Sequence, residues 1–388
     1  MTSGTVDTLG MLGLEIRDRG FRLIQSSGAT SYTKITDAVE WDIPSDAIVN
    51  GVVRRPRQLA ELLQEHLASE AITAKRCAFS IPSRYAFVRD VTLPVMDQQA
   101  LNEAARFRLK KSLPFPVDSA YVEVAPITVL DEDGNGTTMA VAVPKDIVDS
   151  RADALAYAGL EPIFAETDVQ SILRVVHRRA ARLDSLARDS SMTIIDVGSN
   201  TTSMYVVQQR RLQFLRSVKF GIFDLYGKIQ ESAKQDGRDP RAVLEDPESY
   251  VRIDGQLEFK QAGAVATVSI REELGRLIRE VSRLMRYFQS LHPERSFKGL
   301  LNCMLMCGEL AGVPGFLEYF EAQLQFKAEM LRPLFEANLG THARIRDFTE
   351  QHEAKFVTAT GCLLRAIEDE AIAGGMNYGR KGERHIAA

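Results

Sequence analysis

The sequence predicts an α/β protein of two similar lobes, because one strand–acid–turn–strand pattern occurs twice, about half a chain apart. In the first copy, Leu12–Ile24, an apolar strand carries Glu15 at its end. In the second copy, Thr193–Val207, the apolar run ends at Asp196, and a turn of small polar residues follows. A third stretch, Gly299–Leu317, has the pattern of a buried strand that runs into a glycine-rich turn. Two such units indicate a weak internal repeat and therefore two related lobes.

Composition sets the class of protein. A chain of 388 residues is expected to form two or more domains, and an apolar content of 45% is ample for their cores. The net charge is −4 with both signs mixed, so nucleic acid is not the expected partner. No Lys or Arg precedes Arg17 and no apolar run is long enough for a membrane span, so we expect a soluble, cytoplasmic protein. The four cysteines lie in apolar surroundings and are expected to be small core residues rather than zinc ligands.

The first half of the chain predicts a hairpin, a helix and a small α+β unit. The hairpin is expected over Leu9–Ser27, and leucines at helical spacing predict an amphipathic helix over Arg57–Ser69. From about residue 72 to 156, strand patterns alternate with two helical patterns. The first of these helices is expected over Asp97–Leu113, with Asp97 as its N-cap. The turn at Asp131–Gly136 is a strong hairpin signal within the unit.

The second half is expected to alternate between helices and the returning sheet. Gly221–Leu244 and Ala264–Leu291 are predicted to be largely helical, with a polar loop at Asp236–Gly255 between them. Phe348–Asp369 is expected to end in a closing helix. The final stretch, Gly374–Ala388, is glycine-rich and basic without an apolar face, which argues against a membrane-binding helix there.

The two acid-bearing turns and the late glycine-rich turn, in this order, resemble the actin-like ATPase superfamily. Within it, the chain is most similar to the PilM family of type IV pilus assembly. The similarity covers about residues 9–370. Further stretches that carry it are AFSIPSRYAFVR (Ala78–Arg89), EAARFRLKKSLPFP (Glu103–Pro116), KFG (Lys219–Gly221), LGRLIREVSRLMRYFQS (Leu274–Ser290) and KFVTATGCLLRA (Lys355–Ala366).

The resemblance implies an actin-like (ribonuclease H-like) two-lobed fold with an inserted small α+β subdomain, as in PilM-like and FtsA-like proteins. The implied boundaries are 9–71 for the first part of the lobe 1 core (1A), 72–156 for the inserted subdomain (1C), 157–190 for the rest of lobe 1 and the connection between the lobes, 191–222 for the first part of the lobe 2 core (2A), 223–295 for subdomain 2B, 296–346 for the rest of the lobe 2 core, 347–370 for the closing helix that returns to lobe 1, and 371–388 for a flexible tail.

The resemblance also implies a site for ATP and Mg²⁺. Glu15 and Asp196 would hold the metal largely through water, because Mg²⁺ usually keeps several waters and few carboxylates. Glu166 and Asp168 lie where the family places acids that could orient an attacking water. The implied nucleotide-binding residues are Arg17, Asp196, Gly198, Ser199, Asn200, Thr201, Lys228, Glu231, Gly308 and Glu309. For Lys228 and Glu231, a solvent-exposed i,i+3 ion pair is the alternative.

Two of the three implied nucleotide elements depart from the family pattern. Arg17 stands where the first turn has glycine, which adds bulk where backbone should approach a phosphate, and Asp18 adds a negative charge beside it. Glu309 replaces the second glycine of the late turn. One alternative is that Arg17, Arg19 or Arg22 donates to phosphate through its side chain. We therefore rank catalysis below nucleotide binding, and a weak ATPase is the most that these turns suggest.

The function implied by the resemblance is that of a scaffold at the inner membrane. PilM-like proteins bind the short cytoplasmic N-terminal tail of the membrane protein PilN beside the inserted subdomain. The candidate contact residues here are Phe87, Arg89, Phe107 and Lys111, and simple packing or a solvated helix face is their alternative role. Two other functions stay open: an ATP-driven switch that regulates assembly, and a filament-forming protein like FtsA or MreB, which would self-associate.

Overall fold

The computed structural model describes residues 10–28, 33–125, 131–182, 191–208, 211–233, 238–292, 303–346 and 352–373. These residues form two compact units. Unit 1 contains the chain up to Arg174 together with 339–345 and the residues from Thr358 on. Unit 2 contains 175–338 and 346–357.

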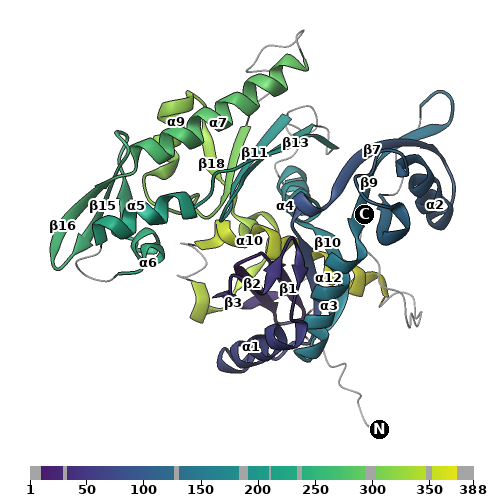
Figure 1. Ribbon diagram of the computed structural model, residues 1–388, viewed down its shortest axis with the longest axis horizontal. Helices are drawn as coiled ribbons and strands as arrows, with labels where there is room; N and C mark the ends of the chain where they lie inside the picture. The colour runs from purple at the N-terminus through teal and green to yellow at the C-terminus, as the bar shows by residue number, and fades with distance from the viewer. Residues whose placement is uncertain are drawn as a thin grey trace. The chain divides into compact units, whose positions relative to one another are not determined.

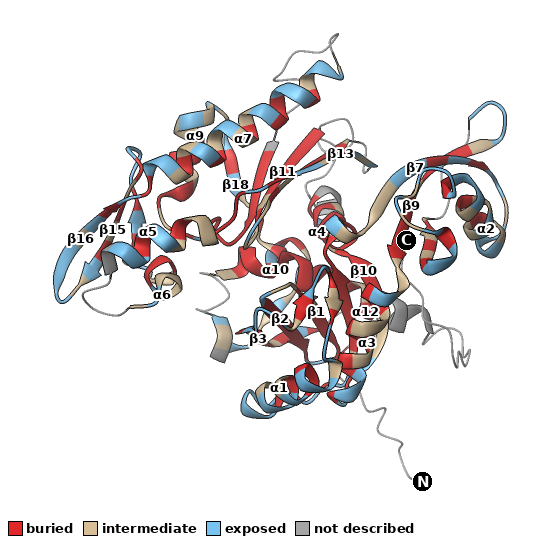
Figure 2. Ribbon diagram, in the orientation of Figure 1, coloured by how far each residue is buried: buried red, intermediate tan, exposed pale blue. Residues whose placement is uncertain are grey.

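Unit 1 is built on a six-stranded sheet in the order β10-β6-β1-β2-β3-β19 (Figure 1). Strands β1 and β2 form an antiparallel hairpin, and β6 and β10 continue the sheet in parallel from β1. The side chains along β2 are all buried, as in a strand that is covered on both faces (Figure 2). The strands are β1 (Leu12–Ile16), β2 (Gly20–Ser26), β3 (Lys34–Asp42), β6 (Arg76–Ile81), β10 (Glu161–Thr167) and β19 (Gly340–Thr341).

Helices cover this sheet. Helix α1 (Pro56–Ser69) begins with proline in its first turn, where no backbone N–H is needed, and it buries three of the predicted leucines. It packs against α3 (Lys145–Tyr157). Helix α4 (Asp168–Arg182) begins in unit 1, and α12 (Val357–Ala373) is the expected closing helix. The short elements of this unit are β4 (Ile48–Val49), β5 (Val52–Val53), η1 (Ser83–Tyr85), η2 (Val117–Ser119) and η4 (Ala343–Ile345).

A second, smaller sheet forms an insert within unit 1. Its order is β7-β9-β8, with β7 at Phe87–Pro94, β8 at Ala120–Val124 and β9 at Asn135–Pro144. Helix α2 (Gln98–Leu109) packs on it, and the side chain of Asp97 caps that helix by accepting from Ala100 N at 2.9 Å. Helix α2 contacts β8 and β7, and Figure 1 shows it beside β7.

The insert is smaller than the predicted unit at 72–156. Strand β6 pairs in parallel with β1 and β10 of the large sheet, and α3 packs on α1. The small sheet therefore comes from residues within 87–144. Burial explains the difference, because β6 is buried along nearly its whole length whereas the exposure of β7 alternates at its C-terminal end.

Unit 2 repeats the arrangement of unit 1 in a five-stranded sheet of order β13-β12-β11-β17-β18. Here β11 forms an antiparallel hairpin with β12 and lies parallel to β17, as β1 does with β2 and β6. The repeat predicted from the two acid-bearing hairpins is thus present in the strand pairing. The strands are β11 (Ser191–Val197), β12 (Thr202–Gln208), β13 (Arg211–Val218), β17 (Cys303–Gly308) and β18 (Ala328–Met330).

A three-stranded sheet, β14-β15-β16, and several helices complete unit 2. The helices are α5 (Phe223–Ala233), α6 (Pro240–Glu245), α7 (Arg271–Ser290), α9 (Phe316–Leu324), α10 (Pro333–Glu336) and the short η5 (Glu353–Phe356). The strands are β14 (Tyr250–Val251), β15 (Gln256–Gln261) and β16 (Ala264–Ser269).

Two predictions for this region are corrected. The predicted helix over Ala264–Leu291 begins only at Arg271, because 264–269 is strand β16. Ala262 and Gly263 both have positive φ, 48° and 81°, which forms a tight hairpin turn between β15 and β16. The predicted polar loop at Asp236–Gly255 contains α6, whose N-cap is Asp239. Among the described residues, no helix has both the length and the apolar character that crossing a membrane requires.

Candidate functional site

In unit 1, the first acid-bearing turn is a tight hairpin. Arg17 N donates to Gly20 O at 2.9 Å, so only Asp18 and Arg19 lie between these two hydrogen-bonded residues at the ends of β1 and β2. Arg19 is exposed. A closed turn of this kind uses its backbone groups within the hairpin.

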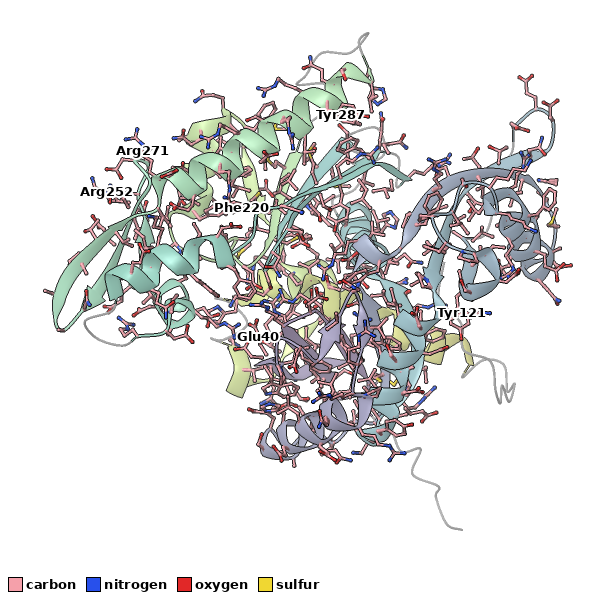
Figure 3. All side chains as sticks on the ribbon, in the orientation of Figure 1. Glu40, Tyr121, Phe220, Arg252, Arg271 and Tyr287 are labelled. Carbon is pink, nitrogen blue, oxygen red and sulfur yellow. The ribbon has the colours of Figure 1, made fainter. Side chains whose placement is uncertain are left out.

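Two arginines and two glutamates form an ion-pair cluster behind that turn. Arg22, whose exposed fraction is 1%, places Nη2 2.9 Å from Glu40 Oε1 and Nη1 3.4 Å from Glu15 Oε2. Arg17 adds Nη2 at 3.4 Å from Glu40 Oε1 and Nε at 3.7 Å from Glu15 Oε1. Figure 3 labels Glu40 on this sheet. Glu15, expected to hold a metal, is thus paired with two guanidinium groups.

Glu40 was not among the predicted residues. It lies on β3 directly across from Arg22 of β2. Opposite charges on neighbouring strands stabilise the pair, but the register that brings them together is not visible in a single strand pattern.

The predicted acids of the connection, Glu166 and Asp168, are held in local networks of unit 1. Glu166 is fully buried and accepts from Ser171 Oγ at 2.6 Å and from Arg174 Nη2 at 2.8 Å. Asp168 accepts from the backbone N and the hydroxyl of Ser83, at 3.0 Å for the backbone contact. A buried carboxylate such as Glu166 requires partners of this kind, because a buried polar group without a hydrogen bond is costly.

In unit 2, the second turn has the compact form that its sequence predicts. Gly198 N donates to Thr201 O at 2.9 Å, and the carbonyl oxygens of Gly198 and Ser199 accept from the start of α5. Asn200 is exposed, and Thr201 is partly exposed. The turn is therefore fixed by its own backbone and by the following helix.

The late glycine-rich turn packs directly on this second turn. Gly308 has φ of +84°, and a Cβ there would lie 2.3 Å from Val197 O and 2.6 Å from Asp196 Oδ1, so only glycine fits. Glu309 N donates to Val197 O at 2.7 Å, and Ser199 Oγ donates to Glu309 Oε1 at 3.3 Å. Four residues predicted for one site, Asp196, Ser199, Gly308 and Glu309, thus come together within unit 2.

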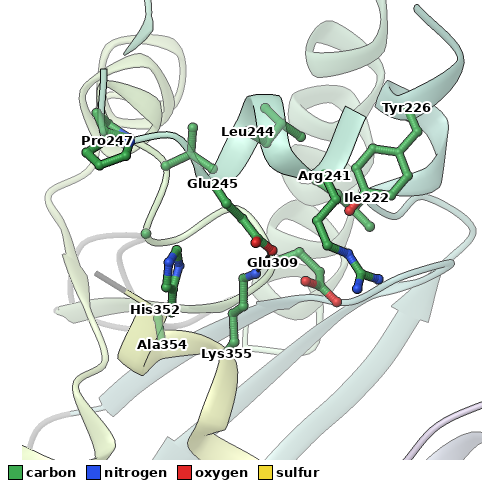
Figure 4. Close-up of a pocket in the computed structure, with 13 residues that line it drawn as sticks. Ile222, Tyr226, Arg241, Leu244, Glu245, Pro247, Glu309, His352, Ala354 and Lys355 are labelled. Atoms are coloured by element: carbon green, nitrogen blue, oxygen red, sulfur yellow. Dashed lines mark hydrogen bonds and ion pairs between the residues drawn. The ribbon is translucent and has the colours of Figure 1, made fainter. Parts of the chain in front are cut away.

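A pocket of about 90 Å³ lies next to these residues in unit 2 (Figure 4). Glu245 and Lys355 form an ion pair across it, and Glu309 lines it. Burial, and next the charge of Glu309, raise the pKa of Tyr226, which also faces the pocket. The lining residues are Ile222, Tyr226, Arg241, Leu244, Glu245, Pro247, Glu309, Gly312, Val313, Pro314, His352, Ala354 and Lys355.

Most of these lining residues were not predicted from the sequence. Tyr226 and Arg241 come from α5 and α6, whereas Lys355 comes from η5 more than a hundred residues later. Lys228 and Glu231, predicted to contact adenosine, do not line the pocket. They form an exposed i,i+3 ion pair on α5, with Nζ 3.8 Å from Oε2.

The residues predicted for the nucleotide site fit a nucleoside triphosphate with Mg²⁺ poorly. The Glu309 carboxylate, with 8% exposure, takes the Ser199 hydroxyl that a phosphate would use, and it repels a second negative charge. In unit 1, Glu15 is already paired with Arg17 and Arg22. Among the described residues, no cluster of three or more His, Cys, Asp or Glu side chains could hold a metal ion.

The predicted partner residues lie on the insert of unit 1. Phe87 is half-buried on β7, and the Arg89 guanidinium lies 5.2 Å from the centre of its ring. On α2, the Phe107 side chain is 81% exposed, and Lys111 follows just beyond the helix and is also exposed. The Phe107 ring is therefore largely accessible to solvent on the surface of the insert.

Comparison with known proteins supports the fold. The sequence model of a family described as type IV pilus assembly protein PilM matches residues 13–239. A chain of a PilM–PilN type IV pilus biogenesis complex has a TM-score of 0.72 and 20% identity, covering 93% of this chain and 99% of that chain. This likeness confirms the predicted actin-like α/β fold.

Two further solved structures are more distant. The ethanolamine utilization protein EutJ from Carboxydothermus hydrogenoformans has a TM-score of 0.49 and 12% identity, covering 91% of this chain and 88% of that chain. MreB5 of Spiroplasma citri bound to ADP has a TM-score of 0.49 and 12% identity, covering 96% of this chain and 99% of that chain.

Proposed function

The chain belongs to the PilM family of type IV pilus assembly proteins, and we propose that it is an actin-like scaffold that binds the cytoplasmic N-terminal tail of a PilN-like inner-membrane protein. It would sit on the cytoplasmic face of the pilus assembly platform and reach the membrane through that partner. The likeness in fold to a chain of a PilM–PilN complex supports this proposal.

The observation that carries the proposal is the exposed aromatic side chain of Phe107 on the insert. At 81%, it is the most exposed large apolar side chain among the described residues. Arg108, Lys110 and Lys111, next to it in the sequence, are also exposed. An apolar anchor within a basic surface suits a short peptide that has both an apolar side chain and carboxylates.

The test is a binding measurement with a PilN-type tail peptide. We expect the full-length protein to bind the labelled peptide in fluorescence anisotropy. Phe107→Ala should weaken binding by about tenfold or more, which is typical of the loss of an aromatic anchor that becomes buried in an interface. Phe335→Ala is the matched control, because Phe335 is also an exposed phenylalanine, at 53%, but lies in unit 2.

Two results would count against the proposal. If the wild-type protein shows no binding at high micromolar peptide, docking of such a tail is rejected. If the tail binds equally well to wild type and Phe107→Ala, the contact surface lies elsewhere on the protein.

A second candidate function, an ATP-driven switch, is favoured by the intact second turn around Asp196 and Gly198. It requires that nucleotide bind two conformations with different affinity. The contact between Glu309 and Ser199 opposes it, since the carboxylate competes with phosphate for the same hydroxyl. Calorimetry with ATP and Mg²⁺ separates the two functions, because only the switch requires saturable nucleotide binding.

A further inference from the structure

The link between the large sheet of unit 1 and the insert is the short helix η1, Ser83–Tyr85. It follows the end of β6 at Ile81 and leads directly into β7, which begins at Phe87. Any constraint on η1 therefore acts on the position of β7, the strand that carries Phe87 and Arg89.

Asp18 of the first acid-bearing turn holds the C-terminal end of η1. Tyr85 Oη donates to Asp18 at 3.2 Å from Oδ2 and 3.3 Å from Oδ1, and Arg84 forms an ion pair with the same carboxylate. The Arg84 guanidinium also lies 4.7 Å from the centre of the Tyr85 ring. Both side chains of the ion pair are only about one-third exposed, at 35% for Arg84 and 28% for Asp18. Hydrogen bonds to a charged acceptor are among the stronger ones in proteins.

The Tyr85 ring has a further contact, with Gly51. It packs against Gly51, whose carbonyl oxygen accepts from the fully buried Arg151 of α3. Burial lowers the pKa of Arg151 to about 10, and the nearby charge of Asp18 partly opposes this effect. The negative charge of Asp18 thus also offsets part of the cost of burying the Arg151 cation.

The N-terminal end of η1 has a separate anchor. Ser83 donates to Asp168 at the start of α4 through both its backbone N and its hydroxyl, and Val169 N donates to Ser83 Oγ at 3.3 Å. Two aspartates from different elements therefore fix the two ends of a three-residue helix. Removing one of them loosens η1 without releasing it.

We infer that the first acid-bearing turn anchors the partner-binding insert in this chain: Asp18 positions η1 through Tyr85 and Arg84, and η1 positions β7 for the tail. This inference rests on the proposed function, and it makes Asp18 and Tyr85 positioning residues that need no contact with the partner. A surface held in its binding conformation loses less conformational freedom on binding, so its affinity is higher.

The test compares two tyrosines that each lose one hydroxyl. Tyr85→Phe removes the bond to Asp18 and keeps the ring. Tyr121→Phe is the matched control, because Tyr121 Oη donates to Asp149 at 3.0 Å from β8, another strand of the same insert (Figure 3). The measurements are the Kd for a PilN-type tail peptide and amide hydrogen exchange of β7.

We expect Tyr85→Phe to weaken the Kd by about three- to tenfold and to speed exchange in 87–94, while Tyr121→Phe stays within about twofold of wild type. A double-mutant cycle with Asp18→Ala should show coupling: the double variant should be hardly weaker than Asp18→Ala alone, because Tyr85→Phe removes one of the contacts that Asp18→Ala already removes.

The inference is overturned if Tyr85→Phe binds like wild type, or if Tyr85→Phe and Tyr121→Phe weaken binding equally, since the insert would then be loosened in general. Should the wild-type protein not bind the peptide at all, the proposed function fails. In that case, amide hydrogen exchange in β7 still tests whether Asp18 and Tyr85 position this strand, because the exchange measurement needs no partner.

Discussion

At the scale of single residues, charged side chains set the chemistry of both acid-bearing turns. In unit 1, Glu15 and Glu40 share Arg22, which is almost fully buried. In unit 2, the Glu309 carboxylate takes a hydroxyl of the second turn. The resemblance assigns Glu15 to the metal and Ser199 to the nucleotide. In the structure, each of these side chains already has a partner within its own unit. A buried charge needs such a partner because desolvation is costly.

A buried thiol gives a pH-dependent prediction at this scale. Cys362 is fully buried on α12, and burial, followed by the charge of Glu166, raises the pKa of its thiol well above the ordinary value. The folded protein therefore keeps this proton when the unfolded chain loses it, so the free energy of unfolding falls as pH rises above about 9.

Urea unfolding of wild type and Cys362→Ala measures this effect. Between pH 8.5 and 9.5 we expect the wild-type stability to fall by about 0.7 kcal/mol more than that of Cys362→Ala, if the thiol of the unfolded chain has its ordinary pKa of 9.0. An identical pH dependence in the two proteins would show that the thiol ionises as readily in the folded state.

At the scale of elements, the two hairpins and their parallel neighbours are the repeated unit of the fold. In unit 2, the end of β17 closes on the end of β11, because Gly308 sits directly against Asp196 and Val197. The contact leaves no room for a side chain. The geometry of the second turn therefore depends on a glycine that lies more than a hundred residues later in the chain.

Gly308→Ala should destabilise unit 2 by at least about 2 kcal/mol, since it adds a backbone clash to the strain of a positive φ. Gly159→Ala is the matched control: Gly159 has the same φ of +84°, and its Cβ would meet no atom within 4 Å. We expect about 1 kcal/mol for that variant. Differential scanning calorimetry measures both, and equal shifts in the two variants would contradict the close packing.

At the scale of the whole molecule, the expected result of nucleotide binding follows from the charge of Glu309 beside the second turn of unit 2. Two unit charges about 4 Å apart near a protein surface repel by about 4 kcal/mol, which corresponds to roughly a thousandfold in affinity. We therefore expect isothermal calorimetry of the full-length protein with ATP and Mg²⁺ to show no saturable heat up to about 1 mM. Glu309→Gly, which restores the glycine pair, should bind more tightly. Wild-type binding in the low micromolar range would revive the ATP-driven switch.

Much of the fold could be predicted because it depends on local sequence patterns. The hairpins at Leu12–Ile24 and Thr193–Val207, the leucines of α1 and the N-cap Asp97 all depend on neighbouring residues. The prediction failed where local patterns are ambiguous. An apolar, β-branched stretch such as 264–269 fits both a strand and the start of a helix, and the positive φ of Ala262 is not visible in the sequence.

Local patterns were enough to predict the class of fold, its internal repeat and the acids Glu15 and Asp196 at the ends of paired strands. The contacts of those acids depend on tertiary pairing, which local patterns do not contain. Glu40 reaches Arg22 through the register of β2 and β3. Tyr85 reaches Asp18 from just beyond the neighbouring strand β6, and Glu309 reaches Ser199 from the end of β17, a neighbour of β11 that is distant in sequence. Strand register and parallel crossovers join residues far apart in the chain, and no local pattern encodes those pairings.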